Sequence, residues 1–161
     1  MLQKEKIRPI HTDDLDRLKE IIDLNELFPS ELLDDMIQPY FERSGEEEFW
    51  ITYEENSVPI AIAYYAPERM TSGTYNLYLI AIHPDFQGKG IGRDMLNFIE
   101  NHLRDRGERI LLIETSGLPE FEKTRDFYKK NNYHQEAVVR EFYAQGEDKI
   151  IFWKSLQGVT L

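Results

Sequence analysis

The chain has 161 residues, 41% of them hydrophobic and 12% aromatic, which favours one globular domain over residues 1–161 and excludes a disordered chain. Its formal net charge of −11 argues against a nucleic-acid partner, because phosphate contacts need clustered Lys and Arg. The lack of cysteine excludes disulfides, thiolate zinc sites and a cysteine nucleophile. With no apolar run of roughly 20 residues and no signal-peptide pattern, we expect a cytoplasmic protein that binds no membrane.

Hydrophobic periodicity and turn residues predict an alternation of helices and strands along the whole chain. In chain order the predicted elements are a strand at 7–10, helices starting near Thr12 and Pro29, strands at 49–53, 58–65 and 75–82, a helix at 90–106, a strand at 110–113, a helix at about 119–130, and strands at 137–143 and 149–153. Ser44-Gly45 is the predicted end of the second helix.

The strand at 75–82, the helix at 90–106 and the strand at 110–113 form a predicted parallel crossover unit. Residues 110–113 are continuously apolar, which is typical of a strand buried on both faces. Together with the strands on either side, this unit predicts an α+β fold around one mixed sheet.

A glycine-rich turn, Gln87-Gly88-Lys89-Gly90-Ile91-Gly92, lies between a predicted strand and the start of the clearest helix. Glycines allow positive φ and let backbone N–H groups approach a ligand, and a helix start offers unpaired donors with a partial positive charge. Residues 86–93 include Lys89 and Arg93 and no acidic residue. The pattern indicates either phosphate binding or simply a tight strand-to-helix turn. It has neither the context of a dinucleotide-binding turn nor the residues of a nucleotide-hydrolysing loop.

Residues 80–93 resemble the acetyl-CoA-binding segment of the GCN5-related N-acetyltransferase (GNAT) superfamily, with Gln87, Gly90 and Gly92 at the motif positions. A second block, residues 124–133, resembles the later helix of that family through Phe127-Tyr128. The resemblance extends over nearly the whole chain and is strongest from Tyr75 to Tyr133. It implies a single GNAT domain. Its sheet would be mostly antiparallel, with about six or seven strands, about four flanking helices and a splayed parallel pair at the acyl-CoA site.

The resemblance implies acetyl-CoA as the cosubstrate and no metal, in line with four histidines that lack carboxylates at ligand spacing. The backbone of residues 80–82, at the end of the predicted strand 75–82, would contact the pantetheine arm. The Ile80 N–H would lie near the thioester carbonyl as an oxyanion-hole donor. Such an apolar run is also an ordinary core strand in any fold. The cofactor-binding residues implied are Ile80, Ala81, Ile82, Gln87, Gly88, Lys89, Gly90, Ile91, Gly92 and Arg93.

Tyr128 matches the family tyrosine that often donates a proton to the leaving CoA thiolate, and a phenol with a pKa of about 10 suits that role. Glu114 resembles the base position of the bacterial ribosomal-protein alanine acetyltransferases. The alternative for Tyr128 is that it only packs the helix against the sheet. The alternative for Glu114 is that it is only a solvated carboxylate at a strand end. Asn76 and Tyr78 are weaker candidates to line the acceptor site.

Two departures from the family pattern affect these expectations. Phe121 stands where many relatives have an asparagine that touches the cofactor. Asn132 stands near an expected glycine, although Asn tolerates the left-handed conformation.

We therefore expect acetyl transfer from acetyl-CoA to a primary amine of a small molecule, peptide or protein, by direct attack in a ternary complex, because no cysteine can carry an acyl intermediate. The alternatives are a non-catalytic acyl-CoA-binding or sensing domain and an interaction module in which the glycine turn is structural. The net charge does not select the acceptor, and a homodimer is left open.

Overall fold

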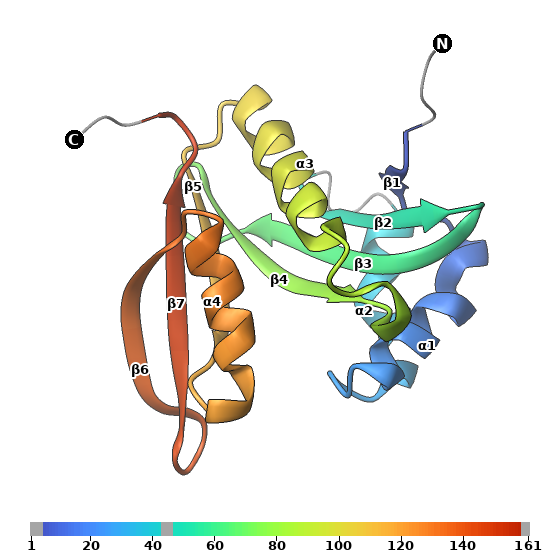
Figure 1. Ribbon diagram of the computed structural model, residues 1–161. Helices are drawn as coiled ribbons and strands as arrows, with labels where there is room; N and C mark the ends of the chain where they lie inside the picture. The colour runs from blue at the N-terminus through green and yellow to red at the C-terminus, as the bar shows by residue number, and fades with distance from the viewer. Residues whose placement is uncertain (1–4, 43–46, 159–161) are drawn as a thin grey trace. The chain divides into compact units, whose positions relative to one another are not determined.

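The computed structural model describes residues 5–42 and 47–158 (Figure 1). The predicted helix end at Ser44-Gly45 lies outside these residues. The described strands are β1 (Ile7–Pro9), β2 (Phe49–Glu55), β3 (Val58–Pro67), β4 (Thr74–Ile82), β5 (Ile110–Ser116), β6 (His134–Ala144) and β7 (Glu147–Ser155). The α-helices are α1 (Leu15–Leu24), α2 (Leu33–Phe41), α3 (Ile91–Asp105) and α4 (Glu122–Lys130). A short 3₁₀ turn comes immediately before α1, α2 and α4, whereas the 3₁₀ turn before α3 is separated from it by the glycine-rich segment.

The strands form a seven-stranded mixed sheet in the order β1-β2-β3-β4-β5-β7-β6. Together with the four α-helices, this confirms the predicted α+β fold. The chain divides into two compact units, Met1–Ala66 with Leu79–Ile99 (unit 1) and Pro67–Tyr78 with Glu100–Leu161 (unit 2), so β4 and α3 contribute residues to both.

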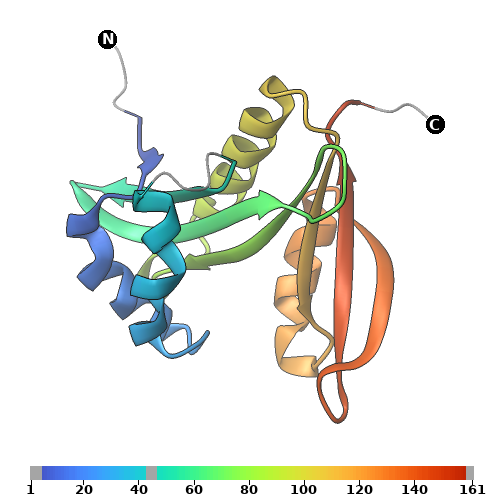
Figure 2. The same cartoon turned by 180° about the vertical axis from the view of Figure 1, so that it is seen from behind.

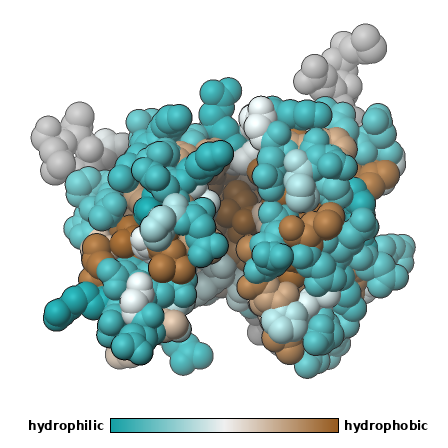
Figure 3. All heavy atoms as spheres, turned by 60° about the horizontal axis from the view of Figure 1, so that its bottom comes forward, coloured by the Kyte–Doolittle hydropathy of each residue, from teal (hydrophilic) through white to brown (hydrophobic). Residues whose placement is uncertain are grey.

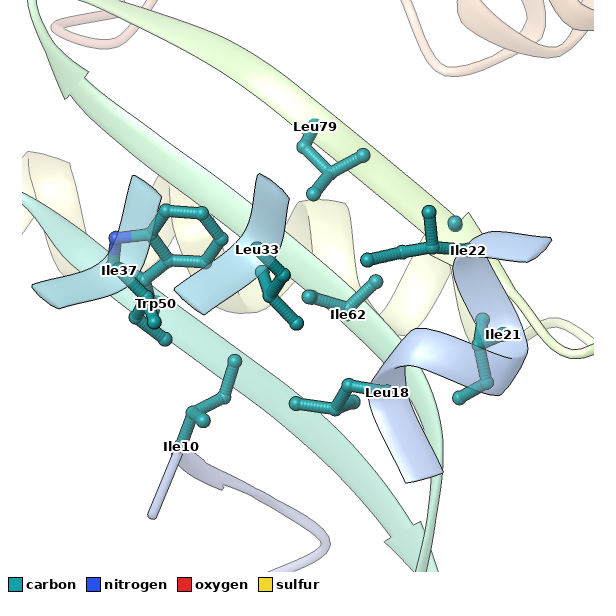
Figure 4. Packing of buried hydrophobic residues seen from close by; sticks show 10 residues of the cluster. Ile10, Leu18, Ile21, Ile22, Leu33, Ile37, Trp50, Ile62 and Leu79 are labelled. Carbon is teal, nitrogen blue, oxygen red and sulfur yellow. The ribbon is translucent and has the colours of Figure 1, made fainter. Parts of the chain in front are cut away.

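Unit 1 is built on the antiparallel strands β1, β2 and β3, with α1 and α2 packed on one face. Figure 4 shows the apolar side chains of the two helices directed at Trp50, Ile62 and Leu79 of the strands. Each fully buried side chain of this kind stabilises the fold by about 1.5–3 kcal/mol. The predicted hairpin between β2 and β3 is present, and Asn56 and Ser57 take positive φ of 52° and 67° at its turn.

Unit 2 contains the first part of β4, which is parallel to β5, and the antiparallel strands β5, β7 and β6. Figures 1 and 2 show α4 along one face of this part of the sheet. The parallel pairing covers Thr74–Leu77 and Ile110–Ile113, whereas β4 continues to Ile82 and β5 to Ser116. The prediction of a parallel pair joined over only part of its length is therefore confirmed.

The last hairpin is longer than predicted. β6 and β7 extend until only Gln145-Gly146 separates them, and Gly146 takes a φ of 80° at the turn. The added residues are mostly polar, so the hydrophobic pattern did not assign them to strands, but their backbones still pair across the hairpin. β6 is exposed along its whole length.

The face seen in Figure 3 is mainly hydrophilic, with groups of apolar atoms among the polar ones. Exposed large apolar residues include Leu24, Leu27, Leu32 and Met36 in unit 1 and Val138, Val139 and Phe142 in unit 2. Among residues 5–42 and 47–158, no helix is both long and apolar enough to cross a bilayer.

Candidate functional site

The glycine turn of unit 1 has the backbone that the sequence predicted. Gly88 and Gly90 have φ of 75° and 82°, in the left-handed region that residues with a side chain rarely adopt. A Cβ added at either position would meet no heavy atom within 4 Å. The turn thus leaves open space beside its backbone, where a ligand can approach closely.

Each backbone N–H from Gly88 to Arg93 lacks a hydrogen-bond acceptor within the part of the chain that the structure describes. The first paired donor is the Asp94 N–H, which donates to the Gly90 carbonyl at 3.0 Å. Because α3 begins at Ile91, the row of free donors coincides with the positive end of the helix dipole. The arrangement can bind phosphate groups.

The two basic side chains of the turn are exposed. The Lys89 Nζ lies 5.3 Å from the centroid of the Phe86 ring. Together with the free N–H groups, Lys89 and Arg93 make this end of α3 positive in an otherwise acidic chain, which suits a pyrophosphate.

Gln87 has a different role from the glycines. Its Nε2 donates to the Ile82 carbonyl at 3.0 Å and to the Asn25 Oδ1 at 3.2 Å, and the Asn25 Nδ2 also donates to the Ile82 carbonyl at 3.0 Å. The side chain therefore fixes the turn against the end of β4 and the C-terminus of α1. The sequence analysis did not predict the role of Asn25, because this residue is 62 positions from Gln87 and no local pattern connects them.

In the apolar segment before the turn, one of the three residues contributes to the core. Ala81 is buried in the cluster beneath α1 and α2, and the Ile80 and Ile82 side chains are half-buried. With two donors on its carbonyl, Ile82 has no further acceptor capacity there.

Tyr128 lies in unit 2, on the buried face of α4. Its ring centroid is 5.5 Å from that of Phe152 on β7 and 6.1 Å from that of Tyr133. Its hydroxyl has no hydrogen bond within the described part of the chain. Burial raises the pKa of Tyr128 above its ordinary value, so the phenol is protonated at neutral pH.

Glu114 is an interior residue of β5, because the strand runs to Ser116 and pairs Glu114 with Ile151. The expected position at a strand end is thus corrected. Its Oε2 lies 3.2 Å from the Lys149 Nζ, and this ammonium lies 3.5 Å from the centroid of the Phe142 ring. Lys149 is two residues from Ile151, so it shares the face of Glu114.

The weaker candidates Asn76 and Tyr78 converge on one carboxylate. The Asn76 Nδ2 and the Tyr78 hydroxyl donate to the Glu68 Oε1 at 2.7 and 2.9 Å. Glu68 follows the end of β3 and was not singled out from the sequence.

A buried ionic cluster supports the aromatic residues around Tyr128. Glu100 of α3 is 5% exposed, and its two oxygens accept from the Tyr133 hydroxyl at 2.7 Å and the Lys154 Nζ at 2.8 Å. Burial and the Glu100 carboxylate raise the pKa of Tyr133. The cluster fixes Tyr133 beside Tyr128. The sequence indicated the aromatic block at 124–133, but nothing in it indicated that Glu100 and Lys154 would join this block.

The loop after β5 is tied to α4 and β7. Arg125 Nη1 donates to the carbonyls of Ser116 and Leu118, both at 2.8 Å, and the Gly117 N–H donates to the Asp148 carbonyl at 2.9 Å. Asn132, in place of an expected glycine after α4, takes a φ of 69°, as its tolerance of this conformation predicts.

Comparison with known proteins identifies the family. A family model for the acetyltransferase (GNAT) family matches residues 13–133. The chain therefore belongs to the GNAT acetyltransferases. The comparison with curated proteins gave no match.

Solved structures agree with this assignment. A Desulfovibrio desulfuricans protein assigned to the GNAT family is similar at 28% identity and a TM-score of 0.87, with 93% of this chain and 98% of that chain covered. The ribosomal-protein-S18-alanine N-acetyltransferase of Escherichia coli shares the fold at 21% identity and a TM-score of 0.74, covering 96% and 98%. So does yncA of Salmonella typhimurium, solved with its cofactor acetyl-CoA, at 16% identity and a TM-score of 0.75, covering 96% and 95%.

Proposed function

We propose that this protein transfers an acetyl group from acetyl-CoA to a primary amine by direct attack in a ternary complex. The observation that carries the proposal is the row of unpaired N–H groups from Gly88 to Arg93, at the start of α3 and beside open glycine backbone. Membership of the GNAT family and the fold shared with a structure that holds acetyl-CoA support the choice of cosubstrate.

In this proposal the N–H groups of the turn bind the pyrophosphate, with Lys89 and Arg93 adding positive charge. The backbone of 80–82 contacts the pantetheine arm, and the Ile80 N–H stabilises the oxyanion. Gln87 acts as a positioning residue for the turn, since its side chain bonds to Ile82 and Asn25.

The ammonium form of the amine loses a proton to Glu114, directly or through water, and the neutral nitrogen attacks the acetyl carbon. The C–S bond then breaks, and Tyr128 donates a proton to the sulfur. The amide nitrogen releases its second proton to solvent, from which the Tyr128 phenolate recovers one. The raised pKa of Tyr128 keeps this proton available at neutral pH, and the free hydroxyl has no competing partner in the described residues.

We also propose that both units together make one acetyltransferase domain, because the family match at 13–133 includes residues of each. The second candidate function is a non-catalytic acyl-CoA-binding domain, which would use the same turn without Tyr128 or Glu114.

Turnover distinguishes the two. The experiment incubates the purified protein with acetyl-CoA and a panel of primary amines, and measures released CoA and the acetylated product. Release that depends on the amine supports transfer. Tight binding of acetyl-CoA without release for any amine would leave the binding domain as the function.

A further inference from the structure

An ammonium group of the chain itself lies beside the proposed base, Glu114. The Lys149 Nζ is 3.2 Å from the Glu114 Oε2. A general base reaches the group that gives it a proton over roughly 2.6–3.2 Å, so this pair is within that reach. Lys149 pairs with Ser116 and Glu114 with Ile151, which makes the two side chains diagonal neighbours on one face of the β5–β7 ladder. Lys149 therefore has the position toward Glu114 that the proposed function requires of an acceptor amine.

The ammonium of Lys149 has few other contacts. The centroid of the Phe142 ring lies 3.5 Å from the Nζ. Within residues 5–42 and 47–158, the Nζ donates to no backbone carbonyl. The side chains of Lys149 and Glu114 are 12% and 24% exposed, and Phe142 is 53% exposed. Because none of the three is sealed from solvent, a second molecule can approach this cluster.

Lys154, on the same strand, is a natural comparison. Its Nζ lies 2.8 Å from the Glu100 Oε1 and 4.8 Å from the centroid of the Tyr133 ring, so it also has a carboxylate and a ring as partners. Five positions separate it from Lys149, which places it on the opposite face of β7, away from Glu114. The two lysines thus have similar partners, and only Lys149 is paired with the proposed base.

We propose that Lys149 is a self-acetylation site, at which the protein transfers an acetyl group from acetyl-CoA to its own Nζ. This inference rests on the proposed function. The Nζ ammonium gives one proton to Glu114, and the neutral nitrogen attacks the acetyl carbon. The C–S bond breaks, Tyr128 protonates the sulfur, and the nitrogen releases its second proton to solvent, from which the phenolate recovers one. The products are acetylated Lys149 and free CoA.

The modification changes the surroundings of the base. Acetylation removes the charge of Lys149, which ends its ion pair with Glu114 and its cation–π contact with Phe142. The carboxylate is then free to receive the amine of an external acceptor. In the part of the chain that the structure describes, Lys149 is the one cation ion-paired with Glu114. Self-acetylation therefore ends after one acetyl group per chain, whereas transfer to an external amine continues.

Peptide mass spectrometry tests the site. The protein is incubated with acetyl-CoA that carries an isotope-labelled acetyl group, without any acceptor, and the label is measured at Lys149 and Lys154. Unlabelled acetyl already present on the purified protein is counted with it. Acetylation by chemical reaction alone would favour Lys154, because its side chain is 20% exposed and that of Lys149 is 12% exposed.

We expect wild type to acetylate Lys149 at least about tenfold faster than Lys154, with a rate constant that does not depend on protein concentration. Glu114→Gln should lower the rate at Lys149 by at least about tenfold and leave the rate at Lys154 unchanged, because it removes only the base. The comparison of the two lysines in wild type needs no variant.

Equal acetylation of the two lysines in wild type, or acetylation of Lys149 that persists in Glu114→Gln, would overturn the inference. So would a rate constant that rises with protein concentration, since it would show transfer between molecules. Release of CoA with a panel of primary amines is measured in parallel. Release that depends on the amine, without acetyl at Lys149, would refute self-acetylation and retain the transferase function. No release and no acetyl at Lys149 would refute both.

Discussion

Tyr128 and Glu114 lie on opposite faces of the ladder between β5 and β7. The Tyr128 ring packs on Phe152, which pairs with Ile113, and the next residue of β5 is Glu114. Since side chains alternate along a strand, Glu114 points to the other face. A proton donor and a proton acceptor on opposite faces can serve the leaving thiolate and the incoming amine separately, without exchanging a proton with each other.

Tyr128→Phe should lower kcat by about 10²–10⁴, the usual cost of losing an acid–base group, while acetyl-CoA affinity is retained. Steady-state kinetics with an amine acceptor check the rate, and calorimetry checks the affinity. Tyr133→Phe is the matched control, because it removes a hydroxyl from the same aromatic group but one that bonds to Glu100. Equal rates in wild type and Tyr128→Phe would assign Tyr128 to packing alone.

Glu114→Gln should reduce the rate most at low pH, where the smallest fraction of the amine is neutral and a base contributes most. The measurement is a pH–rate profile of the variant beside that of wild type, with the same acceptor. Profiles of the same shape and height would move the base to water or to another residue.

Burial of Tyr128 also predicts a pH dependence of stability. Its pKa is raised from the ordinary value of 10.0, so above about pH 10 the unfolded chain loses this proton while the folded chain retains it. The contribution is fully present below pH 10 and is lost as the pH rises toward the folded-state pKa. Urea denaturation between pH 8 and 11 should show the free energy of unfolding falling more steeply in wild type than in Tyr128→Phe. Parallel curves would contradict a buried phenol.

Lys154→Met should destabilise the fold by about 3 kcal/mol, because it leaves the Glu100 carboxylate buried without its cation. This is the lower end of the range for buried pairs, since the Lys154 side chain keeps 20% exposure. Adding Glu100→Gln to Lys154→Met should recover most of the loss, which chemical denaturation of the single and double variants would measure. A double variant no more stable than Lys154→Met would refute a charge effect.

Local patterns in the sequence predicted the order of elements and the glycine turn, because periodicity and positive-φ residues act over a few neighbours. The residues around Tyr128 were harder to predict. Glu100 binds Tyr133 and Lys154, which are 33 and 54 residues away, so no local pattern connects them. The pairing of Glu114 within β5 was missed for another reason: polar residues continue a ladder that the apolar run at 110–113 only begins.

Binding of acetyl-CoA at the turn is the central claim, and Gly90→Asp tests it most directly. The aspartate adds a side chain and a negative charge where the N–H groups would bind pyrophosphate. Gly107→Asp is matched to it, because Gly107 has the same φ of 82° and also has no heavy atom within 4 Å of an added Cβ, but follows the opposite end of α3.

Calorimetric titration of acetyl-CoA into both folded variants is the measurement. We predict that Gly90→Asp loses more than tenfold in affinity, at least about 2 kcal/mol, while Gly107→Asp binds like wild type. Equal affinities in wild type, Gly90→Asp and Gly107→Asp would contradict the proposed binding site.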